Sequence, residues 1–133
     1  LLSLATQLAE FPLSDDLTAR AEARSRTCGS TIDLGVGLDV HSRISKIGMQ
    51  VTACAVGQAS AAILALHAVS VEAHEAGAME QAVHDWLSGK GPVPDWPGFD
   101  ALAPALPHAG RHGALMLPWK ALSQALFKVN EAS

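Results

Sequence analysis

Tyrosine is absent from this chain of 133 residues, and the other aromatic residues are three tryptophans and three phenylalanines. Charged residues are scarce too: nine lysines and arginines stand against 13 aspartates and glutamates, a net charge of -4. Nucleic-acid binding depends on clustered basic side chains that neutralise phosphates, so the composition argues against that partner. Because 49% of the residues are hydrophobic, the chain is not disordered, and we expect a large core or an oligomer interface.

Cysteine is also rare, with Cys28 and Cys54 as the only two. Two thiols without a recognisable export signal fit a reducing compartment, in which cysteines stay free or bind metal. The apolar start from Leu1 to Ala9 lacks the basic leading region and the cleavage site of a signal peptide, and we interpret it as a helix. We therefore expect a cytoplasmic protein.

The length fits one domain over residues 1–133, and there is no internal repeat or linker. The stretch from Ile47 to Val71 contains no charged residue and is long enough to cross a bilayer. However, Gln58 and His67 would be costly in lipid, and the stretch begins with the alternation of a strand. We expect a core strand that leads into a buried helix, and no membrane association.

The hydrophobic pattern predicts one helix before the strands, which ends near Phe11 because Pro12 follows. Three segments with period two predict strands, at Leu17–Arg24, Ile32–Val40 and Ile47–Ala53. Short turns join them, so an antiparallel meander is expected.

Helical periodicity returns after Cys54, where five apolar residues share one face: Val56, Ala59, Ile63, Leu66 and Val69. Further helices are predicted at Ala78–Leu87, at Phe99–Ala103 and after Pro118. The predicted fold class is α+β, with a three-stranded antiparallel sheet and helices packed on one of its faces.

The two cysteines are the candidate site residues. Cys28 lies at the turn between the first two strands, and Cys54 lies where the third strand gives way to a helix, a position that favours the thiolate. Antiparallel topology would bring both sulfurs to one end of the sheet. Their spacing alone is not a zinc pattern, and an ordinary loop cysteine and a buried cysteine remain open alternatives.

The histidines give weaker signals. His67, His74 and His84 are expected to be surface or core residues, because no ligand set surrounds them. His108 and His112 are predicted to lie in the loop before the last helix, and His112 is the candidate substitute ligand.

Three segments resemble the signature regions of the SufU branch of the IscU/NifU iron-sulfur cluster assembly scaffolds. They are Cys28-Gly29, the stretch from Cys54 to Ser60, and Arg111 through Trp119-Lys120-Ala121-Leu122. They follow in order along nearly the whole chain. The resemblance implies a single NifU/IscU-like domain over residues 1–133 with a SufE/NifU-like fold.

Two positions depart from the family pattern. Ser30 stands where the family has an aspartate, and Ala114 stands where it has a third cysteine. Neither residue replaces a thiolate or a carboxylate as a strong metal ligand.

The resemblance implies a scaffold that binds iron, as a 2Fe-2S cluster or a single iron or zinc ion, or that accepts sulfur. Its ligands would be Cys28 and Cys54, with His112 as the substitute metal ligand, and its partners a cysteine desulfurase and apo iron-sulfur proteins. A homodimer would offset the missing ligands. The alternative is a degenerate homologue that acts as an interaction protein without metal. An enzyme with Cys54 as nucleophile is disfavoured, because nothing nearby identifies an orienting third group.

Overall fold

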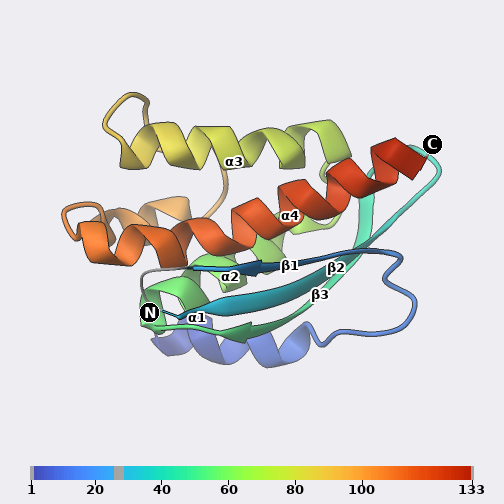
Figure 1. Cartoon of the computed structure of the whole chain (residues 1–133), viewed down its shortest axis with the longest axis horizontal. Coiled ribbons are helices and arrows are strands. Elements are labelled where there is room, and N and C mark those ends of the chain that lie inside the picture. The colour runs from blue at the N-terminus through green and yellow to red at the C-terminus, as the bar shows by residue number, and fades with distance from the viewer. Residues whose placement is uncertain (1, 26–28, 133) are drawn as a thin grey trace.

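The structure, a computed structural model, describes residues 2–25 and 29–132. Its elements are α1 (Leu2–Thr6), η1 (Gln7–Glu10), β1 (Ala19–Arg24), β2 (Thr31–Leu38), β3 (Ile44–Thr52), α2 (Ala55–Ala68), α3 (Ala73–Leu87), η2 (Phe99–Ala105), η3 (Ala109–Arg111) and α4 (His112–Ala132). In Figure 1, α4 lies along the sheet and α3 lies outside α4. The predicted α+β fold with a three-stranded antiparallel sheet is confirmed.

The sheet has the order β1-β2-β3. One of its faces is buried and the other is open, and successive side chains of each strand alternate between the two faces. Ala21, Leu34 and Met49 are paired across the three strands and are buried beneath the helices. This alternation follows from the period of two, which sends successive side chains to opposite faces. The next row belongs to the open face and consists of Glu22, Asp33 and Gln50.

Residues 11–17, called the strap below, cross part of the open face between η1 and β1. The strap begins at the outer edge of β3, where the amide of Met49 donates to the carbonyl of Phe11 over 2.8 Å. It then passes beneath Gly48, where a Cβ atom would lie 2.2 Å from the carbonyl oxygen of Pro12. Glycine is therefore required at position 48, because a side chain would displace the strap.

The predicted bounds of several elements are wrong. Strand β1 begins at Ala19, β3 at Ile44 and α3 at Ala73, whereas the hydrophobic pattern placed these starts at Leu17, Ile47 and Ala78. Strand β2 ends at Leu38, not at Val40, whose side chain is 94% exposed. The turn begins earlier because the Asp39 carboxylate accepts the amides of His41 and Arg43. The last helix begins at His112, before Pro118, which lies inside it.

The prediction for α2 needs a correction as well. Its burial is not confined to one stripe, because the helix is enclosed by α1, α4 and β3. Val69, predicted to face the core, lies beyond the helix and is exposed. The buried residues of α2 are Val56, Gly57, Ala59, Ser60, Ala61, Ala62, Ile63, Leu64, Ala65 and Ala68.

The uncharged stretch from Ile47 to Val71 divides between β3 and α2, as expected. No helix within residues 2–25 and 29–132 combines the length and the apolar character needed to span a bilayer.

Candidate functional site

The candidate site lies at the end of the sheet where β3 leads into α2. Thr31, at the start of β2, pairs with Thr52, at the end of β3. The turn between β1 and β2 closes at this end, where the amide of Ser25 donates to the carbonyl of Ser30 over 2.8 Å. Cys28 belongs to this turn but lies outside the described residues. Its closeness to Cys54 therefore stays a prediction.

Cys54 is the residue that caps the N-terminus of α2. Its backbone is extended, with φ -67° and ψ 173°, and its carbonyl accepts the amide of Gln58 over 2.9 Å. The Gln58 side chain folds back and donates to the carbonyl of Ala53 over 2.8 Å. The Cys54 thiol is half-buried and makes no capping hydrogen bond. Cys54 is thus a partly exposed residue at a strand-to-helix junction.

Ala114, which stands at the third-cysteine position, packs against the first turn of α2. A Cβ atom on Gly57 would lie 2.8 Å from the Cβ of Ala53 and 3.2 Å from the Cβ of Ala114. Ala114 is 1% exposed, so its methyl group is enclosed by neighbouring residues. Position 114 therefore lies beside Gly57, which is one helical turn along α2 from Cys54, but it contributes packing and no ligand atom.

His112 is the first residue of α4, not a loop residue as predicted. Its Nε2 lies 2.8 Å from the carbonyl oxygen of Leu106, and it is the hydrogen-bond donor because a carbonyl can only accept. In the neutral ring, Nδ1 is then the nitrogen with a free lone pair. His112 could bind a metal only through Nδ1.

The remaining predicted residues bring no ligand set together. His67, His74, His84 and His108 are exposed, as expected for surface residues. Ser30, which immediately precedes β2, is buried and 3% exposed. Within the described part of the chain, no group of three or more histidine, cysteine, aspartate or glutamate residues is placed to hold a metal ion.

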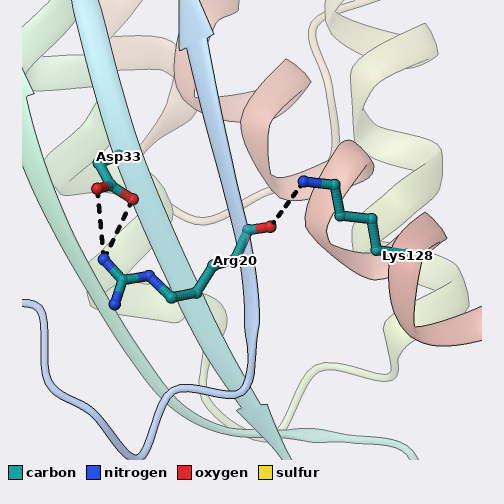
Figure 2. Close-up of polar contacts among 3 residues, drawn as sticks. All are labelled: Arg20, Asp33 and Lys128. Atoms are coloured by element: carbon teal, nitrogen blue, oxygen red, sulfur yellow. Dashed lines mark hydrogen bonds and ion pairs between the residues drawn. The ribbon is translucent and has the colours of Figure 1, made fainter. Parts of the chain in front are cut away.

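The open face of the sheet forms a polar hollow of about 430 Å³ at the same end. Its lining residues are Glu22, Ala23, Arg24, Thr31, Ile32, Asp33, Gln50 and Thr52. Next to it, Arg20 bridges to Asp33 over 3.3 Å, and Lys128 of α4 donates to the carbonyl of Arg20 over 3.2 Å (Figure 2). Only the register of the three strands shows that these residues share one hollow.

No protein-family model matches the chain, and no curated protein matches it. Solved structures do match. The N-terminal part of a nitrogen-fixing NifU-like protein from Brucella abortus has a TM-score of 0.82 and 24% identity, over 98% of this chain and 93% of that chain. A putative iron-sulfur cluster assembly scaffold protein for the SUF system from Fervidobacterium islandicum AW-1 has a TM-score of 0.84 and 20% identity, over 94% and 92%.

A third structure, of a hypothetical protein, has a TM-score of 0.76 and 21% identity, over 95% of this chain and 96% of that chain. At these identities the likeness establishes the fold. The predicted NifU-like and SufU-like architecture is confirmed over nearly the whole chain.

Proposed function

We propose that this chain, which has the fold of the NifU-like and SufU structures, is a scaffold-type protein of iron-sulfur cluster assembly. It holds iron, or a transient cluster, through Cys28 and Cys54. The observation that carries the proposal is the half-buried Cys54 thiol at the start of α2, at the sheet end to which the residues flanking Cys28 also lead. Iron and sulfide are then cargo, and the protein is a carrier, not an enzyme.

The number of ligands determines how the cargo is held. A 2Fe-2S cluster takes four protein ligands, and one chain offers Cys28, Cys54 and the Nδ1 atom of His112. Two copies that each contribute two cysteines supply four thiolates, and an external thiol is the other source. A single iron or zinc ion makes a smaller demand, because solvent can take an open position.

Anaerobic reconstitution with iron and sulfide tests the proposal. We expect a visible chromophore that is lost in Cys28→Ser and in Cys54→Ser and weakened in His112→Ala. His84→Ala is the matched control, because it removes an exposed imidazole on α3. The cluster proposal is abandoned if no chromophore forms, or if the chromophore is unaffected by Cys28→Ser.

The proposal also includes partners and a location. A cysteine desulfurase would supply sulfur, and apo iron-sulfur proteins would receive the product. A reducing compartment such as the cytoplasm fits this role, because the thiols must stay unoxidised.

A second candidate is a degenerate scaffold that acts as an interaction protein without metal. It is favoured by the burial of Ala114 and Ser30, the two positions at which the family pattern has ligands. Metal analysis of protein purified without air separates the candidates. Stoichiometric iron or zinc supports the carrier, whereas metal-free protein that still binds the desulfurase supports the interaction protein.

Ala114→Cys is a further discriminating variant. The new sulfur would lie beside Gly57, in the first turn of the helix that Cys54 caps. If the protein is a scaffold whose cluster site lacks one ligand, Ala114→Cys should increase the yield of cluster. Ala114→Ser, which introduces a side chain of similar size without a thiol, should not. Equal yields in the two variants would count against a metal site at this position.

A further inference from the structure

A second hollow, of about 280 Å³, lies beside the first turn of α2 and faces η2. Its walls are almost entirely apolar. They consist of Ala55 and Val56 of α2 and of Ala101, Leu102, Pro104 and Ala105 of η2. Small-molecule sites are concave and mostly apolar, with a few polar groups that fix orientation.

The residues that line the hollow are held in place by the surrounding structure. Leu102 and Val56 are buried in the core, so they hold their positions without a ligand. The chain beyond η2 is fixed by the hydrogen bond from His112 to the carbonyl of Leu106, 2.8 Å long. A bond of 3.0 Å from the amide of His108 to the carbonyl of Ala105 fixes it further. A ligand therefore meets a site that is already formed, which lowers the entropic cost of binding.

The charge of the hollow has a single sign. Arg111 and His108 complete the lining, and no acidic residue takes part in it. Within the described residues, neither of these two side chains has a hydrogen-bond or ion-pair partner. A basic hollow in a chain of net charge -4 favours an anion over a cation.

We propose that this hollow binds a small organic carboxylate with a short apolar tail. The carboxylate pairs with the guanidinium of Arg111, whose planar fork matches the two oxygens of a carboxyl group. The tail lies against Val56, Leu102 and Ala105 and loses its contact with water. The hollow is open to solvent on one side and holds about 280 Å³, which is enough for a short apolar tail. Binding needs neither Cys54 nor a metal, so this inference is independent of the proposed function.

Titration of the intact protein with sodium hexanoate, followed by NMR, tests the inference. We expect saturable shifts of the methyl signals of Val56, Ala101 and Ala105, with a Kd on the order of 1 mM for a ligand of this size. Hexan-1-ol and hexylamine are the matched probes, with the same tail and no negative charge. Both are expected to bind at least about tenfold more weakly, because they lack the charged hydrogen bonds.

Two charge-matched variants locate the anion. Arg111→Gln is expected to weaken hexanoate binding about tenfold. Lys120→Gln removes an exposed cation that does not line the hollow, and it is expected to leave binding unchanged. Cys54→Ser is expected to bind hexanoate normally, even though it should lose metal.

Three results would overturn the inference. The first is equal binding of hexanol and hexanoate, which would mean that the negative charge of the carboxylate does not contribute to binding. The second is equal loss in Arg111→Gln and Lys120→Gln, which would indicate a general charge effect. The third is a set of shifted signals away from the hollow.

Discussion

At the residue scale, the hydroxyl of Ser60 joins α2 to α4 inside the core. It donates to the carbonyl of Leu115 over 2.7 Å and accepts the indole N–H of Trp119 over 2.9 Å. We expect Ser60→Ala to lower the free energy of unfolding by about 2–3 kcal/mol, because a buried N–H loses its acceptor. Urea denaturation measures this loss.

A double-mutant cycle provides the control for Ser60. Trp119→Phe removes the indole N–H, so in that background Ser60→Ala should cost less than it does alone. If the losses of unfolding free energy in the two single variants add up to the loss in the double variant, the Ser60 hydroxyl does not stabilise the fold through the indole N–H.

Gly48 is a second residue whose role depends on the fold. Gly48→Ala places a methyl group against Pro12 of the strap, and we expect a loss of about 2 kcal/mol or more. Gly77→Ala is the matched control, because nothing lies within 4 Å of the added atom. In that helix interior, alanine should stabilise by about 0.5–1 kcal/mol. A similar loss in both variants would contradict the role of the strap.

Gly48 and Ser60 make contacts that no pattern in the sequence predicts. Position 54 was predicted correctly, because the change from strand to helical periodicity is a local signal. Gly48 and Ser60 carry no local signal of their contacts. Their partners, Pro12 and Trp119, are distant along the chain, and only the packed fold brings them together.

At the scale of elements, α2 is packed between α1, α4 and β3. Ala62 is fully buried, so Ala62→Leu should lower the free energy of unfolding by about 1–3 kcal/mol through overpacking. Ala78→Leu is the matched control on the exposed side of α3, where the change should be within about 0.5 kcal/mol. Equal thermal midpoints for the two variants would contradict the close packing of α2.

Helix α4 shows why helix ends are hard to predict. Proline usually marks the start of a helix, and this rule suggested a start after Pro118. In the structure, α4 extends back to His112 because Ala114, Leu115 and Leu117 are buried in the core. Pro118 removes one backbone donor, the one that would reach Ala114, and tertiary packing outweighs that loss.

At the scale of the whole molecule, acid should weaken the fold through two carboxylates. Hydrogen bonds from the amides of Arg43 and His41 lower the pKa of Asp39 below its usual 3.8. A hydrogen bond from Lys46, with a second from Ser14, lowers the pKa of Asp16 below 3.8.

Folding therefore favours the ionised forms of both groups. Their stabilisation is fully present above about pH 4 and is lost as the pH falls through the lower pKa of the folded state. Unfolding titrations between about pH 2 and pH 6 should show a shallower acid slope for Asp39→Asn and for Asp16→Asn than for the unaltered protein.

Salt distinguishes the two carboxylates. Asp16 pairs with Lys46 across 2.8 Å on the surface, and dissolved ions screen such pairs. The acid response due to Asp16 should shrink in about 1 M salt, whereas the response due to Asp39, held by backbone amides, should persist. Equal salt sensitivity would contradict this assignment.

The candidate site was only partly predictable. Strand order and turn length correctly placed Cys54 at the sheet end where the turn between β1 and β2 closes, because an antiparallel meander with short turns has few alternatives. The burial of Ala114 and the hollow between α2 and η2 were missed. Ala114 packs beside Gly57, and the hollow lies between Val56 and Leu102; no periodic signal connects such distant segments.

The strap also restricts the order in which the chain can fold. Residues 11–17 leave the ribosome before β2 and β3, yet Pro12 rests beneath Gly48, which is synthesised 36 positions later. The strap has no surface to dock on until the sheet has formed, so it stays undocked while β2 and β3 are being synthesised. We therefore expect strap docking to be a late step of folding. Changes at this contact should mainly accelerate unfolding and leave the rate of sheet formation almost unaltered.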